Sequence, residues 1–149
     1  MLDRAFHSIA WQLWHAARWD DFFAAHFMGD FGREPATEVW KREGLAAHWS
    51  LSTERLGDRE AGTGLDDLEA ENIQLPDQDQ VVAYARKAFA FAESAIEAMN
   101  GNLEMVAKDD PDGDSNLDNV FNYYEHLSRH LGMLEAIRGL QGFSGTATR

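Results

Sequence analysis

The chain has 149 residues, of which 44% are hydrophobic and 26% are charged, as in an ordinary soluble globular protein. This length is typical of one domain with its own core, so we expect a single domain over residues 1–149. The formal net charge of -13 repels nucleic-acid phosphates and anionic lipid headgroups. Because Lys and Arg are scattered singly along the chain, we expect neither a nucleic acid nor a membrane as a partner.

The absence of cysteine excludes disulfides, thiolate metal ligands and a cysteine nucleophile from this chain. It also fits a reducing compartment. Residues 1–23 include Asp3 and Arg4 and contain no uninterrupted apolar run, which is not typical of a signal peptide. No stretch approaches the roughly 18 apolar residues that a membrane span needs. We therefore predict a cytoplasmic location.

The first predicted helix covers residues 8–28. Ser8 is a suitable N-cap, and Gly29 and Gly32 are expected to end the helix. Trp19 and Phe22 widen its apolar face, so we expect neighbours on more than one side. The apolar residues that recur at helical spacing are Ile9, Leu13, Trp14, Ala17, Ala24 and Phe27.

A long mixed segment follows, from Asp30 to Leu75. Within it, "EPATEVWKREGLAAHW" (residues 34–49) can form one or two short helices with Thr37 as a cap, whereas residues 57–67 are predicted to be a loop. A link of this length is unusual between antiparallel neighbours. It suits two helices that run parallel and need a crossover connection.

The second long helix is predicted to begin after Asp77, with Gln80 as a capping-box partner, and to end at Asn100-Gly101. Its apolar stripe consists of Val81, Val82, Ala85, Ala88, Phe89, Ala92, Ile96 and Met99.

The third long helix is predicted to begin after Ser115, which forms a capping box with Asp118, and to stop at Gly142. Strand patterns are weak throughout, so the predicted class is all-α, a helical bundle. The apolar stripe of this last helix consists of Leu117, Val120, Phe121, Tyr124, Leu127, Leu131, Leu134 and Ile137.

Two histidines of the third helix, His126 and His130, lie one helical turn apart. Side chains at i and i+4 share one face, about 5–6 Å apart at their bases, which suits two ligands of one metal ion. The alternative is that both lie at a half-exposed edge and bind water. His15, between two tryptophans of the first helix, is the best candidate for a third ligand, although a buried histidine with one hydrogen bond is the alternative there. His48 in the link is a reserve ligand.

Two segments resemble the DinB/YfiT-like superfamily of small metal-binding helical proteins. They are "HSIAWQLWHAARWDDFF" (residues 7–23), with a Trp-His-x-x-Arg motif, and "YYEHLSRHLGMLEAIRGLQG" (residues 123–142), with His-x-x-x-His-Leu-Gly-x-x-Glu-x-x-Arg-Gly-Leu-x-Gly. The resemblance extends through the Gly-Thr-Gly of residues 62–64 and through residues 81–99, and so covers nearly the whole chain.

The resemblance implies a metal site and a fold. In such proteins one histidine from the second bundle helix and a His-x-x-x-His pair from the last helix hold a divalent metal ion. Carried over by position, these ligands are His15, His126 and His130. The implied fold is a four-helix bundle of up-down-down-up type, whose parallel central pair accounts for the long link.

The chain departs from the family at its N-terminus, because it begins where the family's second helix begins and the usual first helix is absent or truncated. The link segment around residues 38–50 can fill the gap, a second copy can cover the exposed face, or the sequence is a shortened form of a longer gene product. An uncovered apolar face favours association, so we expect a homodimer.

Three neutral imidazoles leave open positions on a metal ion, as in catalytic rather than structural sites. Zinc or nickel suits this ligand set, and iron and manganese are alternatives. Such an ion can hold a thiol as thiolate or lower the pKa of water. The resembling family includes transferases of low-molecular-weight thiols and metal-dependent hydrolases.

The first hypothesis for function is therefore a metal-dependent transferase that delivers a low-molecular-weight thiol to an electrophilic small molecule. Since the chain has no cysteine, the thiol must be a cosubstrate. The alternatives are a non-catalytic metal-binding or stress-response module that acts through dimerisation, and a metal-dependent hydrolase.

Several neighbours of the predicted site follow from helical spacing. Gln12 and Arg18 lie three residues on either side of His15 and are expected to face the site, where Arg18 would bind either an anionic group of the substrate or an acidic neighbour. Glu135 and Arg138 are most simply a surface ion pair. The aromatic residues that either line a pocket or form core are Trp11, Trp14, Trp19 and Tyr123.

A further acidic segment, "DPDGDSNLDN" (residues 110–119), only partly matches a calcium loop. It has Ser115 at the sixth position in place of Gly, and Phe121 at the twelfth in place of Glu. We therefore expect an acidic loop that favours the N-terminus of the following helix instead.

Overall fold

The computed structural model of the chain describes residues 7–30, 37–106 and 113–146. Its long helices are α1 (Ile9–Asp30), α5 (Gln78–Met99) and α6 (Asn116–Leu140). Short helices α2 (Val39–Arg42), α3 (Leu45–His48) and α4 (Asp67–Glu71), with the 3-10 turns η1 (Thr53–Arg55) and η2 (Asn102–Glu104), occupy the connections. The described residues form no strand, which confirms the predicted all-α class.

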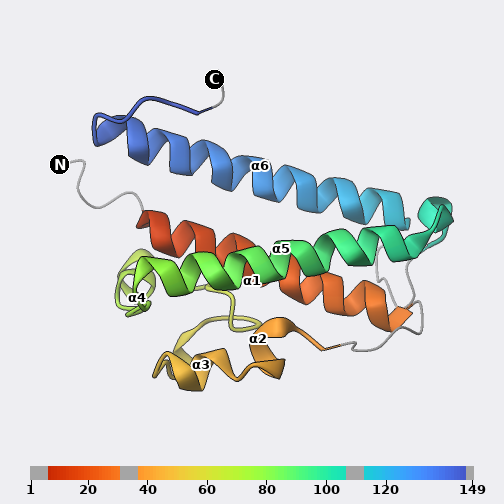
Figure 1. Cartoon of the computed structure of the whole chain (residues 1–149), viewed down its shortest axis with the longest axis horizontal. Coiled ribbons are helices and arrows are strands. Elements are labelled where there is room, and N and C mark those ends of the chain that lie inside the picture. The colour runs from red at the N-terminus through yellow and green to blue at the C-terminus, as the bar shows by residue number, and fades with distance from the viewer. Residues whose placement is uncertain (1–6, 31–36, 107–112, 147–149) are drawn as a thin grey trace.

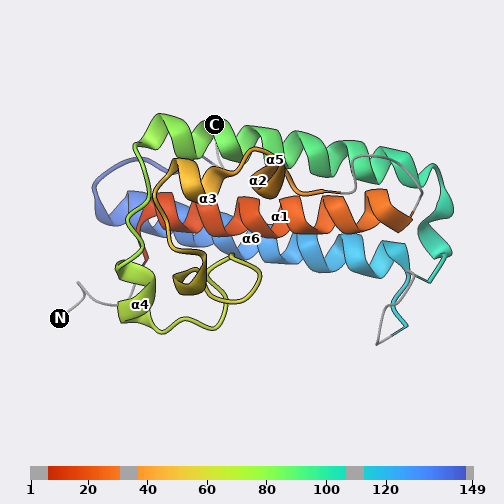
Figure 2. The same ribbon diagram turned by 90° about the horizontal axis from the view of Figure 1, so that it is seen from below.

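Helices α1 and α5 run in the same direction, and α6 runs back against them (Figure 1, Figure 2). The parallel pair explains the long link, because the chain must return along the bundle before α5 can begin. Helices α2 and α3 lie on the side of α1 opposite to α6 (Figure 1). This order matches the last three helices of an up-down-down-up bundle.

The helix ends follow the predicted capping chemistry with four differences. Helix α1 continues through Gly29 to Asp30, and the N-cap of α2 is Glu38, without a side-chain hydrogen bond, in place of the predicted Thr37. Ser8 accepts a hydrogen bond from the amide of Trp11, and Ser115 forms the expected capping box with Asp118. Asp77 caps α5, but the side-chain amide of Gln80 donates to the carboxylate of Asp77 at 2.8 Å. The side chain of Gln80 does not bind the backbone N–H of Asp77, so the predicted capping box does not form. The predicted loop also ends in α4, which a capping box between Asp66 and Glu69 begins.

Small side chains on α5 allow it to pack closely on α1. Ala85, Ala88, Ala92 and Ala95 are all buried along one face of α5. At one end of the pair, the core includes Trp14 of α1, Trp40 of α2, Leu56 and Tyr84. At the other end, the core includes Phe23, Phe27, Ala92, Ala95 and Met99.

The apolar stripe predicted for α6 is only partly buried. Phe121, Tyr124 and Leu131 are 61%, 68% and 57% exposed, although they continue the stripe that ends with buried Ile137. Periodicity predicted the helix correctly, but the partner that would cover this face is not among the described residues. No helix in the described part of the chain is long and apolar enough to cross a membrane.

Candidate metal centre

The structure brings three predicted histidines together. His15 projects from α1, and His126 and His130 project from successive turns of α6. The Nε2 atom of His126 lies 3.3 Å from Nε2 of His15 and 3.0 Å from Nε2 of His130. One ligand atom from each ring lies within 4.8 Å of the others. These separations approach the spacing of about 3.3 Å between nitrogen ligands of tetrahedral zinc.

Two carbonyl groups fix the orientation of two of these rings. Nδ1 of His15 lies 2.5 Å from the backbone oxygen of Ala61, and Nδ1 of His130 lies 2.5 Å from Oε1 of Gln12. Because a carbonyl oxygen only accepts hydrogen bonds, each Nδ1 carries the proton and each Nε2 presents a lone pair. This arrangement of the outer ring nitrogen is typical of histidines that ligate metals.

The donor set fits a divalent cation. Burial lowers the pKa of His15 and of His130 from 6.5 to about 4, so both rings are neutral at neutral pH. Nε2 of His126 faces the Nε2 lone pairs of both His15 and His130. A proton on Nε2 of His126 can form a hydrogen bond with only one of these two lone pairs. Nδ1 of His126 is buried and has no hydrogen-bond partner among the described residues. A cation would satisfy all three lone pairs at once.

The loop whose Ala61 carbonyl contacts His15 approaches α1 so closely that it requires a glycine. Gly62 follows Ala61 and has a φ of +83°. A Cβ atom at this position would lie 2.7 Å from Cζ2 of Trp11 and 3.1 Å from Cζ3 of Trp14. Trp11 also stacks on His15, with ring centroids 4.8 Å apart and planes 9° apart. The glycine therefore lets the carbonyl of Ala61 reach the imidazole.

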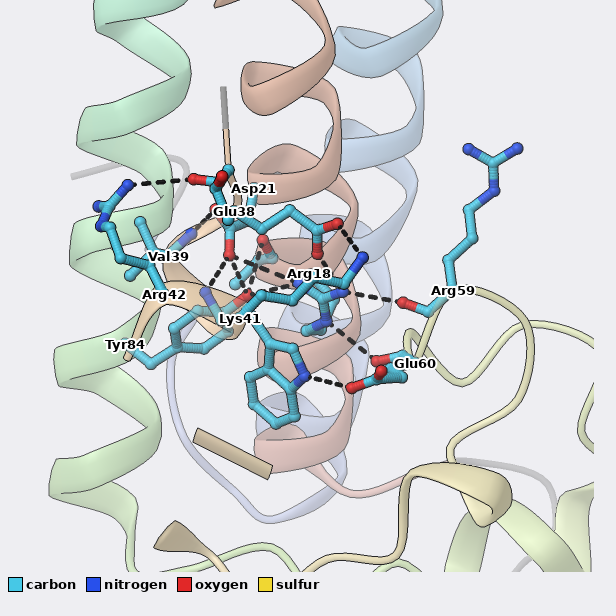
Figure 3. Close-up of polar contacts among 12 residues, drawn as sticks. Arg18, Asp21, Glu38, Val39, Lys41, Arg42, Arg59, Glu60 and Tyr84 are labelled. Atoms are coloured by element: carbon cyan, nitrogen blue, oxygen red, sulfur yellow. Dashed lines mark hydrogen bonds and ion pairs between the residues drawn. The ribbon is translucent and has the colours of Figure 1, made fainter. Parts of the chain in front are cut away.

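Arg18 anchors the same loop from the other side. It is fully buried, donates from Nε to the carbonyl of Glu60 at 2.9 Å and donates from Nη2 to the carbonyl of Arg59 at 2.8 Å (Figure 3). Nη2 also pairs with Glu38 at 2.7 Å, and Nη1 lies 3.4 Å from Asp21. Arg18 therefore ties the loop next to the histidines to acidic residues of α1 and the link.

Backbone and side-chain contacts complete this buried network. Asp21 accepts the amides of Val39 and Trp40 at 2.7 and 2.8 Å, which holds the start of α2 against α1. Burial alone lowers the pKa of Arg18, but its contacts with Tyr84 and Glu38 outweigh burial and raise that pKa above its ordinary value. The arginine therefore stays charged inside the fold.

A pocket of about 410 Å³ opens onto His15 and His126. Its other walls are Trp19, Thr63, Asn122 and Tyr123. The indole nitrogen of Trp19 donates to Oγ1 of Thr63 at 3.1 Å, which fixes the orientation of that wall. The volume lies in the range of about 300–1,000 Å³ that small-molecule sites occupy.

Other predicted residues lie elsewhere. His48 is exposed on α3 and is not part of the histidine cluster. Arg18 contacts acidic neighbours rather than the cluster, and Trp14 belongs to the core. The predicted ion pair of Glu135 and Arg138 is replaced by other contacts.

Those contacts lie at the C-terminal end of α6. Glu135 accepts hydrogen bonds from the amide and hydroxyl of Thr146, and Arg138 donates to the carbonyl of Ser144 at 3.4 Å. Of the acidic segment at residues 110–119, residues 110–112 lie outside the described residues. Ser115 and Asp118 of the same segment form the capping box of α6.

Sequence reasoning did not find the carbonyl of Ala61 or the partners of Arg18. A backbone carbonyl carries no residue-type signature, and Glu38 lies 20 residues from Arg18. The Gly-Thr-Gly of residues 62–64 is the sequence feature that could have indicated a close contact next to Ala61, since a glycine is needed where a loop meets a helix closely.

Comparison with known proteins gives one family. The model of the DinB superfamily matches residues 3–134. The chain belongs to the DinB superfamily. A search of curated proteins and a search of solved structures each give no match. The resemblance seen in the sequence is thus confirmed, and membership in the DinB superfamily agrees with a three-histidine group that could hold a metal ion.

Proposed function

We propose that this DinB superfamily protein binds one divalent metal ion through His15, His126 and His130 and transfers a low-molecular-weight thiol to an electrophile held in the adjoining pocket. The observation that carries the proposal is the convergence of three Nε2 atoms beside that pocket. Zinc or nickel suits three imidazoles, with iron and manganese as alternatives. When bound, such an ion would supply positive charge that keeps a thiol deprotonated at neutral pH.

The chain's own residues would orient the reactants. Ala61 and Gln12 hold the imidazoles of His15 and His130, and the stacked indole of Trp11 limits rotation of His15. Trp19 and Tyr123 provide flat walls for an aromatic electrophile next to the histidines. In a transfer to a halogenated nitroarene, the thiolate sulfur forms a bond to carbon and halide leaves with the electron pair of the broken bond. The thiol proton passes to solvent.

The composition of the pocket favours thiol transfer over hydrolysis. Among the described residues, none of those that line it carries a carboxylate. Metal-dependent hydrolases commonly use a glutamate as general base to activate water. A thiolate needs no such base once its proton has been lost. A hydrolase and a non-catalytic metal-binding or stress-response module are the competing functions.

An assay with several thiols and a halogenated nitroarene tests the proposal. The metal-loaded protein should accelerate the loss of halide with at least one thiol, and His126→Ala should abolish that acceleration. His48→Ala is the matched control, because His48 is exposed and is not part of the cluster. Turnover of esters or amides instead would favour a hydrolase. A metal-loaded protein that turns over neither class would favour the binding module.

We also propose that the exposed face of α6 pairs with a second copy of the chain. Phe121, Tyr124 and Leu131 form an exposed apolar stripe along this helix. Glu125 and Arg129, 3.7 Å apart at i and i+4, flank the stripe with opposite charges. A two-fold, antiparallel pairing of α6 with itself would bring the glutamate of one copy towards the arginine of the other.

Light scattering after size exclusion tests the pairing. The protein should elute as a dimer, and Tyr124→Lys with Leu131→Lys should give a monomer with unchanged helical content. The control Ser94→Lys, on the exposed side of α5, should remain dimeric. A parent that is monomeric at all concentrations would contradict the pairing.

A further inference from the structure

A single arginine overhangs the aromatic wall of the pocket beside the histidines. The guanidinium carbon of Arg59 lies 4.1 Å from the ring centroid of Phe22 and 5.6 Å from that of Trp19. Trp19 is itself a wall of the pocket. Figure 3 shows the backbone carbonyl of Arg59 facing Arg18 while the side chain extends away from the buried network. A positive charge is therefore held close to Trp19, one of the residues that line the pocket.

The backbone that carries Arg59 is fixed in an unusual conformation. Arg59 and Glu60 have φ values of +56° and +55°, a region that residues other than glycine seldom adopt. The fully buried Arg18 binds both of their carbonyl groups. Strain of this kind persists where the surroundings enforce it and is common at ligand-binding sites. The loop therefore presents the side chain of Arg59 from a defined position.

The charges around Arg59 leave room for a further anion. Its Nε lies 3.6 Å from Oδ2 of Asp58, and both side chains are substantially exposed, so this ion pair is weak and exchangeable. On the α6 side, burial and the charge of Asp20 raise the pKa of Tyr123 above its ordinary value, whereas the charge of Arg59 opposes that rise. Arg59 is thus close enough to act electrostatically on Tyr123, another residue that lines the pocket.

The polarity of the pocket then defines a substrate. His15 and His126 line it together with the aromatic side chains of Trp19 and Tyr123, and the guanidinium of Arg59 lies over the ring of Trp19. No carboxylate from the described part of the chain lines the pocket, although the net charge of the chain is -13. Guanidinium groups pair well with carboxylates and stack on aromatic rings.

We propose that Arg59 recognises a carboxylate on the electrophilic substrate, so that the preferred electrophile is an aromatic acid. The reactive carbon would face the histidines and the carboxylate would pair with Arg59. The inference about reactivity rests on the proposed thiol transfer, whereas recognition of the acid does not. The thiol cosubstrate is the other molecule that could carry the carboxylate. We assign the carboxylate to the electrophile because Arg59 stacks on the aromatic wall.

Calorimetric titration with 4-chloro-3-nitrobenzoate and the uncharged 4-chloro-3-nitrobenzamide tests the recognition. The parent should bind the acid roughly tenfold more tightly than the amide, both with and without metal. Arg59→Gln should bring the two affinities together, and Arg59→Lys should restore part of the preference. The control Arg86→Gln, an exposed arginine on α5, should leave the preference intact.

Several outcomes would overturn the inference. They are the absence of a preference in the parent, an equal loss in Arg86→Gln, and binding of the acid only when metal is present, which would place the carboxylate at the histidines. Steady-state kinetics separates the two sources, because Arg59→Gln should raise KM for the acid roughly tenfold while leaving KM for the thiol unchanged. An effect on the thiol alone would assign the carboxylate to the thiol and overturn the inference.

The same experiments distinguish this inference from the proposed function. Preference for the acid without metal binding or turnover would defeat the thiol transfer and leave the recognition intact. Turnover that does not depend on Arg59 would overturn the recognition and leave the thiol transfer intact.

Discussion

The imidazole of His15 is held by the backbone of Ala61, 46 residues further along the chain, through a contact of 2.5 Å between Nδ1 and the carbonyl oxygen. This contact couples the candidate metal centre to the crossover link. The link returns the chain between two parallel helices and also positions a ligand. Arg18 on α1 closes the arrangement by binding the carbonyl groups of Arg59 and Glu60 just before Ala61.

Gly62→Ala should damage the centre through a steric clash. Its Cβ would lie 2.7 Å from Trp11 on a backbone with φ of +83°. Gly64→Ala is a matched control, because Gly64 has φ of +81° and nothing within 4 Å of its Cβ position. The control should lose about 1 kcal/mol of unfolding free energy from strain alone, and Gly62→Ala about 2–4 kcal/mol. Urea denaturation measures both, and equal losses would contradict the close approach.

Gln12→Ala should weaken metal binding while leaving the three histidines in place. Oε1 of Gln12 accepts from Nδ1 of His130, and loss of such a partner typically lowers metal affinity about 10–100-fold. Competition with a chromophoric chelator measures the affinity. The control Gln74→Ala changes an exposed glutamine in the link and should bind metal as the parent does. Unchanged affinity in Gln12→Ala would show that the ring of His130 needs no such support.

Arg18→Met should destabilise the fold strongly. The substitution leaves Asp21 buried without its cation and leaves Glu38 with the half-exposed Lys41 as its remaining cation, which we expect to cost about 3–5 kcal/mol. Lys87→Met breaks the exposed pair with Glu43 and should cost no more than about 1 kcal/mol. Similar losses in the two variants, measured by chemical denaturation, would be inconsistent with a buried ionic network.

Asp20→Asn should stabilise the metal-free protein at alkaline pH. Asp20 is 5% exposed, its Oδ1 has no hydrogen-bond partner among the described residues, and burial, with a contribution from Asp21, raises its pKa from 3.8 to about 7. Between pH 4 and 7 the folded state binds more protons at this group than the unfolded state, so its contribution to stability falls as pH rises. We expect a gain of about 1–3 kcal/mol at pH 8, because the buried amide of Asn also lacks a partner.

The difference between parent and Asp20→Asn isolates this carboxyl group. His15 and His130 act with the opposite sign, because their folded pKa values near 4 lie below 6.5 and their contribution to stability is lost as pH falls through this window. Both proteins contain these histidines, so their effect cancels. The gain should therefore disappear at pH 4, and a gain that is independent of pH would exclude a titrating Asp20.

Some features of the fold and the site could be predicted from the sequence. His126 and His130 share a face by helical spacing alone, and the length of the link predicts that α1 and α5 run parallel. The meeting of His15 with this pair required the resemblance to a family, because periodicity does not say which faces of two helices oppose each other.

Other features could not be predicted. The stripe containing Phe121 and Tyr124 predicts an amphipathic helix but does not identify what covers it. Spacing placed Arg18 near His15, yet its role depends on Glu38 and on carbonyl groups of a loop, which only the tertiary fold brings together.

The central claim is tested most directly by the metal content of untagged protein, measured by mass spectrometry after reconstitution with divalent ions. We expect one bound ion per chain, lost in His15→Ala and in His130→Ala and retained in His48→Ala. Failure of the parent to bind metal, or retention of the ion in both variants of the cluster, would contradict the three-histidine centre.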